Sequence, residues 1–131
     1  IEFRTRMTNE GIVQGFQWLD GSFLEDIEKT ESRPPNDLDI VTFFGGLTDV
    51  DQQRISTSFP EFRSSRLSKQ NFRLDHYPVD ATYDPNITVE LTRYWIQLFG
   101  HNRSGVWKGM LRLELNTLSI DQQALDYLNC L

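Results

Sequence analysis

The sequence has almost no cysteine and no long hydrophobic run. Cys130 is the single cysteine in 131 residues, so no disulfide framework can form, and a reducing compartment is expected. No apolar run approaches the ~20 residues that a membrane-spanning helix needs, and no basic-then-apolar leader opens the chain. We therefore expect a cytoplasmic protein without membrane contact.

Basic residues are also scarce: the sequence has 13 Lys and Arg against 19 Asp and Glu, which gives a net charge of -6. This balance disfavours a protein that holds nucleic acid over its whole surface. A small phosphorylated ligand bound through metal ions remains compatible, because a divalent cation supplies positive charge. The length fits one domain, 1–131. Because the chain opens on Ile1 and not on methionine, segments can be missing from it.

Hydrophobic patterning predicts alternating strands and helices, with Gly or Pro between several of them. The stretch 38–44 is the most strongly indicated strand, because β-branched and aromatic residues fill it and Gly45-Gly46 ends it. Its apolar density favours burial on both faces. The expected strands are 12–19, 38–44, 76–83 and 107–115, and the expected helices are a short one near 23–27, then 48–55, a short one opening at Pro60, 86–98 and 119–128.

Several local signals refine this order. Thr48 and Asp51 form a capping box, as do Ser119 and Gln122. Pro78 favours an edge position for its strand. Core positions are predicted for Trp18, Trp95 and Trp107, and for the side of the last helix that carries Ile120, Ala124, Leu125 and Leu128.

Two acids open the 38–44 strand. Alternate side chains of a strand share a face, so Asp37 and Asp39 project together with Cα atoms about 6.5 to 7 Å apart. Two carboxylates in this arrangement suit Mg²⁺, which completes its shell with phosphate oxygens and water. The alternative is a pair of solvent-facing acids at a strand's start. The buried run that follows argues against a solvated edge, because the repulsion of two such acids must be offset by a cation or by hydrogen bonds.

Gly21-Ser22 ends the first strand. A glycine there lets the backbone approach a ligand closely, and free N–H groups in the following turn favour phosphate oxygens. Alone this pair is a plain turn, and it gains meaning from the Asp-x-Asp strand downstream.

Together, Gly21-Ser22 and Asp37-Leu38-Asp39-Ile40 resemble the motif of the nucleotidyltransferase superfamily related to polymerase beta. The wider run from Gly15 to Phe23, with Pro34 to Asp39, is similar to an uncharacterised bacterial branch of it. The resemblance implies an α/β fold of α+β type, in which a small mixed sheet bears the acids and helices pack mainly on its other face.

The implied reaction moves an NMP group from a nucleotide triphosphate to a hydroxyl acceptor and releases pyrophosphate, with two Mg²⁺ or Mn²⁺ ions. By the resemblance, Asp37 and Asp39 bind both ions, and Gly21 with Ser22 grips the terminal phosphates. Such families carry a third acid on a later strand. Asp80 is our choice over Asp75 and Asp84, because it sits mid-strand between apolar neighbours.

Arg103 and Lys108 lie in a polar turn and could reach a triphosphate, although a solvated turn is the alternative. His76 is expected to be structural. The acceptor, a protein, an RNA end or a small molecule, is not identified by the sequence, and a second domain or protein partner can complete such an enzyme. Two alternatives stay open: a catalytically degenerate binding partner of toxin-antitoxin or defence type, and an unrelated α/β interaction domain.

Overall fold

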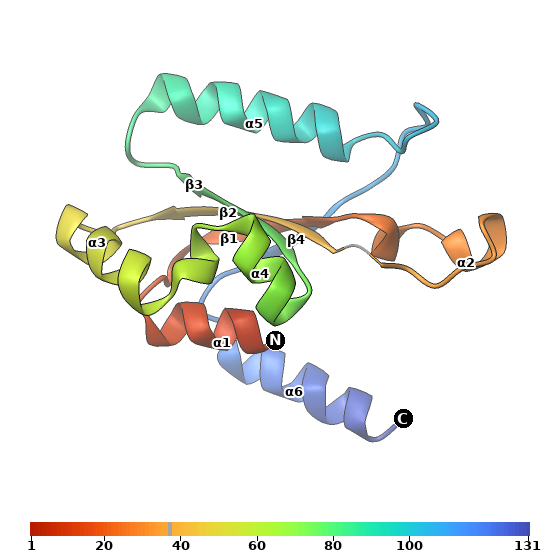
Figure 1. The fold of residues 1–131 in the computed structure, drawn as a ribbon, viewed down its shortest axis with the longest axis horizontal. Coiled ribbons are helices and arrows are strands. Elements are labelled where there is room, and N and C mark those ends of the chain that lie inside the picture. Colours follow the sequence, from red (N-terminus) through yellow and green to blue (C-terminus); the bar gives the residue numbers. More distant parts are fainter. Residues whose placement is uncertain (37) are drawn as a thin grey trace.

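A four-stranded mixed sheet lies between two layers of helices in the computed structural model, which describes residues 1–36 and 38–131 (Figure 1). The strands are β1 (Gln14–Asp20), β2 (Asp39–Gly45), β3 (Asp75–Asp80) and β4 (Leu111–Glu114). Their order is β3-β2-β1-β4. β1 is antiparallel to both β2 and β4, whereas β2 and β3 are parallel. The α/β class expected from the sequence is confirmed.

Helices cover the two faces of the sheet unequally (Figure 1). α1 (Glu2–Asn9), α3 (Asp49–Ser58), α4 (Ser65–Phe72) and α6 (Leu118–Asn129) lie on one side, and α5 (Pro85–Phe99) covers the other. The remaining elements are the 3₁₀ turns η1 (Ser22–Leu24) and η2 (Pro60–Phe62) and the short helix α2 (Ile27–Thr30). None of the described helices is long and apolar enough to cross a membrane.

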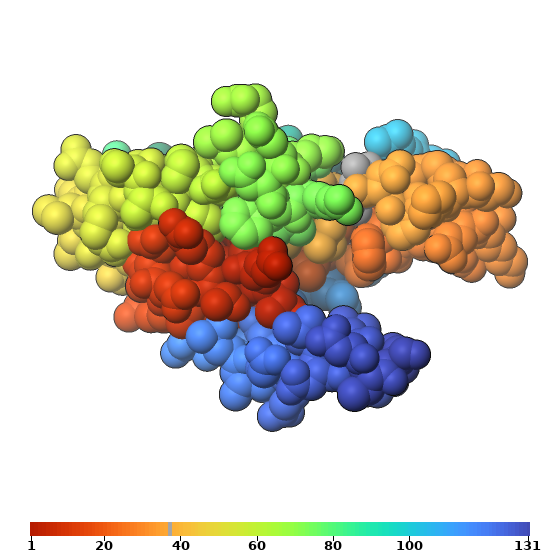
Figure 2. Space-filling model, turned by 60° about the horizontal axis from the view of Figure 1, so that its bottom comes forward, coloured from red at the N-terminus to blue at the C-terminus, as the bar shows by residue number. Residues whose placement is uncertain are grey.

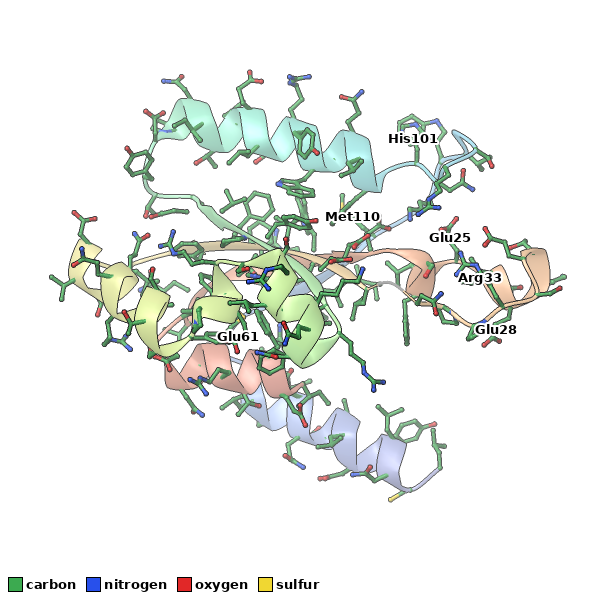
Figure 3. The ribbon with its side chains drawn as sticks, in the orientation of Figure 1. Glu25, Glu28, Arg33, Glu61, His101 and Met110 are labelled. Atoms are coloured by element: carbon green, nitrogen blue, oxygen red, sulfur yellow. The ribbon has the colours of Figure 1, made fainter. Side chains whose placement is uncertain are left out.

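β2 is the centre of two hydrophobic clusters because its residues alternate between the faces. Phe44 packs toward α1 and α3, while Val41 and Phe43 pack toward α5. Met110 lies between α5 and the sheet (Figure 3). All five residues from Ile40 to Phe44 are buried, so the prediction of a strand buried on both faces is confirmed. Asp39 has the parity of Val41 and therefore belongs to the α5 face.

The local signals for two elements are confirmed. Thr48 and Asp51 cap α3 reciprocally, with the Asp51 backbone N–H donating to Thr48 Oγ1 and the Thr48 N–H donating to Asp51 Oδ2. β3 is an edge strand, as Pro78 indicated. α1 and α4 are two short helices that the sequence patterning did not predict.

Burial at the C-terminal end differs from expectation. Trp107 is 79% exposed, and the strand is confined to 111–114, where all four residues are exposed at the sheet edge. Ile120 on α6 is 62% exposed, and Leu128 and Ala124 are exposed too. α6 is seen along one side of the molecule in Figure 2. An amphipathic pattern identifies an apolar face without showing what covers it, so the prediction of a buried face was wrong.

Candidate functional site

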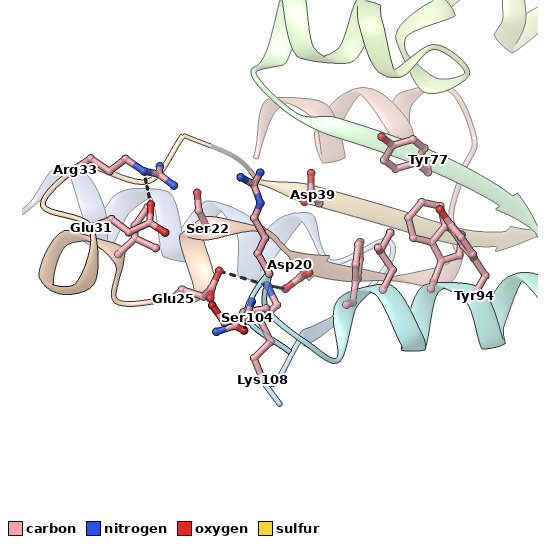
Figure 4. Close-up of a pocket in the computed structure, with 17 residues that line it drawn as sticks. Asp20, Ser22, Glu25, Glu31, Arg33, Asp39, Tyr77, Tyr94, Ser104 and Lys108 are labelled. Carbon is pink, nitrogen blue, oxygen red and sulfur yellow. Dashed lines mark hydrogen bonds and ion pairs between the residues drawn. The ribbon is translucent and has the colours of Figure 1, made fainter. Parts of the chain in front are cut away.

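A pocket of about 330 Å³ opens where β1 ends and β2 begins (Figure 4). Its walls come from the turn after β1, the start of β2, β3, one side of α5 and the loop 102–108. Glu25 and Arg33 lie at the same end of the molecule, near α2 (Figure 3). Segments that are far apart in the sequence thus form one concave surface.

Gly21 shapes the first wall of this pocket. Its φ of +96° and ψ of -178° lie in a region that residues with a side chain avoid. This conformation turns the chain from β1 directly into η1. Ser22 is anchored across the site, because its Oγ accepts a hydrogen bond from the Asn36 backbone N–H at 3.2 Å. Gly21 and Ser22 both line the pocket.

Asp39 forms the adjacent wall. In the antiparallel register it pairs with Asp20, the residue before Gly21, so the two sequence motifs meet at one end of the sheet. Figure 4 shows the side chains of Ser22 and Asp39 at this edge. Asp37, the other acid of the Asp-x-Asp motif, lies outside the described residues.

Asp80 is not part of this site, which corrects its choice as the third acid. It is registered with Phe44, five residues along the strand from Asp39, a separation of about 16 Å. It also faces the opposite side of the sheet, where Gln52 Nε2 of α3 donates to its Oδ2 at 2.9 Å. Thr82 donates to Oδ1 through its backbone N–H and its hydroxyl, at 3.0 and 2.8 Å. Asp80 therefore ties a turn and a helix together.

Asp75, and not Asp80, is the acid of β3 that lies beside Asp39. The parallel register pairs it directly with Asp39, on the same face. Lys69 Nζ of α4 forms an ion pair with Asp75 Oδ2 at 2.7 Å. Burial, together with the charges of Asp75 and Asp39, raises the pKa of the Tyr77 phenol above its usual range. Two carboxylates thus act on one phenol at the pocket.

The cations of the pocket differ in their partners. Lys108 Nζ lies 2.7 Å from Asp20 Oδ1 and 3.7 Å from Glu25 Oε2. Burial raises the pKa of Asp20, and Lys108 partly offsets this rise. Arg33, which the sequence analysis did not single out, also lines the pocket and pairs with Glu31 at 2.6 Å. Its signal was its place in the Pro-rich loop just before the Asp-x-Asp strand.

Arg103 lines the same pocket as Lys108, with an exposed side chain. The polar turn 102–108 is therefore folded over the site, with Asn102 Oδ1 accepting from the backbone N–H groups of Ser104 and Val106. Both basic residues singled out from the sequence are brought to the pocket that contains Gly21, Ser22 and Asp39.

Carboxylate oxygens are the donors available for a metal ion here. Asp39 and Asp75 offer the hard oxygen ligands that suit Mg²⁺ or Mn²⁺. In the part of the chain that the structure describes, no three His, Cys, Asp or Glu residues form a group that could hold a metal. The donor chemistry fits a divalent cation that completes its shell with phosphate and water.

A family model described as "Family of unknown function (DUF6932)" matches residues 1–114. The chain belongs to this family. The DUF6932 match includes every segment of the pocket, from the turn after β1 to the loop 102–108, and ends before α6. Comparisons with curated proteins and with solved structures found no match.

Proposed function

We propose that the protein is a metal-dependent nucleotidyltransferase that moves an NMP group from a nucleotide triphosphate to a hydroxyl acceptor. The acceptor oxygen bonds to the α-phosphorus, the bond from that phosphorus to the oxygen bridging to the β-phosphate breaks, and pyrophosphate leaves. The observation that carries this proposal is the shared pocket of Gly21, Ser22 and Asp39. The cytoplasm is the expected location, and the acceptor is a protein, an RNA end or a small molecule.

Phosphate binding falls to the wall formed by Gly21 and Ser22. The glycine brings the backbone close to a ligand without a side chain in the way, and turn N–H groups favour anions. Arg33, Arg103 and Lys108 line the same pocket and supply the positive charge that three phosphates need. Binding would draw Arg33 and Lys108 away from Glu31 and Asp20, their present partners.

Metal binding falls to the carboxylates of Asp39 and Asp75, together with Asp37 as proposed from the sequence. Bound Mg²⁺ or Mn²⁺ would supply charge stabilisation to the phosphate oxygens. Lys69 neutralises Asp75 through its 2.7 Å contact and so reduces the repulsion between the acids of β2 and β3. The same lysine is a competitor that a metal ion must displace.

Label transfer tests the proposal. The protein is incubated with each nucleotide triphosphate labelled at the α- or the γ-phosphate, with Mg²⁺ or Mn²⁺ and a cell extract. We expect an acceptor to take up the α-label and not the γ-label, and Asp39→Asn to abolish uptake. Asp126→Asn, on exposed α6, is the matched control and should keep it. Equal uptake of both labels would contradict nucleotidyl transfer.

A catalytically degenerate binding partner, of toxin-antitoxin or defence type, is the second candidate. The ion pairs Lys69–Asp75 and Lys108–Asp20 favour it, because lysines already neutralise two acids of the site. Thermal melting separates the two functions. Ligands that bind only the native state raise its melting temperature, so an active enzyme should be stabilised by Mg²⁺ with nucleotide, whereas a degenerate one should melt unchanged.

A further inference from the structure

Aromatic rings form one wall of the pocket. Tyr77 projects from β3, and Tyr94 comes from α5, which covers that face of the sheet. The residues are 36% and 52% exposed, respectively. Both line the pocket, so part of their exposed surface faces the cavity.

Trp95 holds these two rings in place. Its ring centroid lies 4.8 Å from that of Tyr77 and 5.0 Å from that of Tyr94. Trp95 itself is buried against Phe99 and Val79 in the cluster beneath α5. The two tyrosines are therefore positioned before any ligand arrives, which lowers the entropy that binding must overcome.

The walls of the pocket follow a fixed order along the sheet. Figure 4 shows Ser22 and Arg33 on one side of Asp39, and Tyr77 and Tyr94 on the other. The strand register agrees, because Tyr77 lies two residues beyond Asp75, about 6.6 Å further from the end of the sheet where Asp39 and Asp75 pair. Groups that can bind phosphate, then carboxylates, then aromatic rings therefore follow one another along the pocket.

We propose that Tyr94 and Tyr77 are the stacking surface for the nucleobase of the bound nucleotide. This inference rests on the proposed function, which sets the phosphates at Gly21 and Ser22. In a nucleoside triphosphate the phosphates, the sugar and the base follow in a line, so phosphates at that wall direct the base past Asp39 toward the rings. Stacking on an aromatic face accepts every base, so this wall gives affinity for nucleosides without choosing among them.

Calorimetric titration compares ATP with inorganic tripolyphosphate, each with Mg²⁺, on the parent and on three variants. Tyr94→Leu removes the ring, and Tyr94→Phe keeps it. Tyr127→Leu, at an exposed tyrosine on α6, is the matched control. We expect Tyr94→Leu to weaken ATP binding about 5- to 150-fold, the range that one stacked base contributes. Tyr94→Leu should bind tripolyphosphate as the parent does, and Tyr94→Phe and Tyr127→Leu should bind ATP with the parent's affinity.

Three results would overturn the stacking surface: equal affinity of the parent for ATP and tripolyphosphate, unaltered ATP binding by Tyr94→Leu, or equal losses in Tyr94→Leu and Tyr94→Phe. The transfer assay separates this failure from that of the proposed function. If ATP binding depends on the Tyr94 ring but no label is transferred, the proposed enzyme activity is wrong and the stacking surface is supported. If label is transferred but ATP binding does not depend on the ring, the activity is supported and the stacking surface is wrong.

Discussion

Gly21 is the residue whose backbone most directly shapes the site. Alanine at its φ of +96° and ψ of -178° is strained, and such conformations cost about 1 to 3 kcal/mol. We expect Gly21→Ala to lower the free energy of unfolding by that amount in a urea titration and to weaken nucleotide binding. Gly109→Ala is the control, since Gly109 has no positive φ and a Cβ there would meet no atom within 4 Å. Equal stability of the two variants would mean that the turn can relax.

Asp39 and Asp80 offer a direct contrast between an acid of the site and an acid of the scaffold. Asp39→Asn should fold as well as the parent or better, because one repelling charge is removed, while transfer activity falls by orders of magnitude. Asp80→Asn keeps only one acceptor oxygen, so it should lose either the bond from Gln52 or those from Thr82, cost about 1 to 3 kcal/mol of stability, and keep transfer. Melting curves and label uptake, measured on both variants, check this. If Asp80→Asn lost transfer and Asp39→Asn lost stability instead, the metal would have to bind near Asp80.

His76 makes stability depend on pH. It is fully buried, with Nε2 2.7 Å from Thr42 Oγ1, and burial lowers its pKa to about 3 from 6.5. Between those values the unfolded state binds the additional proton, so stability is complete above pH 6.5 and is lost as the pH falls. The expected slope is about 1.4 kcal/mol per pH unit.

Urea titrations between pH 7 and pH 5 measure this slope. His76→Gln keeps a side chain that can bond Thr42 but cannot titrate, so it should be less stable than the parent at pH 7 and show a flatter pH profile. Parallel profiles for the two proteins would assign the acid sensitivity to other groups.

At the scale of elements, α1 and α6 are joined through one side chain. Arg4 Nε lies 2.7 Å from Asp121 Oδ2, and its guanidinium also donates to Gln17 Oε1 and Thr117 Oγ1 at 2.7 and 2.6 Å. Both ionic side chains are largely buried, and removing one partner of such a pair costs about 3 to 5 kcal/mol. We expect this loss for Arg4→Ala, with faster amide exchange in α6.

A double-mutant cycle with Asp121→Ala tests this coupling. The double variant should lose less unfolding free energy than the two single variants lose in total, because it leaves neither charge of the pair without its partner. Additive losses would mean that Arg4 and Asp121 act independently.

Some elements were predictable from local signals, whereas the capping box expected at Ser119 and Gln122 did not form, because α6 begins at Leu118 with Thr117 as its N-cap. The strand 38–44 and the cap at Thr48 rest on local residues, and both are present. α1 and α4 were missed, because each has only eight residues and helices this short depend on tertiary packing. Trp107 is exposed because it lies outside β4, in an isolated bridge with His101, and periodicity does not show where the strand begins.

At the scale of the molecule, the site was predictable only in part. The family resemblance predicted that Gly21 and Asp39 share one site, and the antiparallel pairing of β1 with β2 brings them to the same end of the sheet. The choice between Asp75 and Asp80 required the β2–β3 register, which the residues flanking each acid do not reveal. The aromatic wall likewise depends on where α5 crosses the sheet.

The parallel pairing of β2 with β3 has a consequence for how the protein becomes active. Asp39 and Asp75 are brought together only after the chain between them has closed a long loop, and such non-local contacts slow folding. The pocket at this end of the sheet should therefore be among the last features to form. In refolding from urea, we expect nucleotide binding to return no earlier than the buried aromatic core, as tryptophan fluorescence and a nucleotide probe can time. Binding that returned first would mean that the pocket assembles without this strand pair.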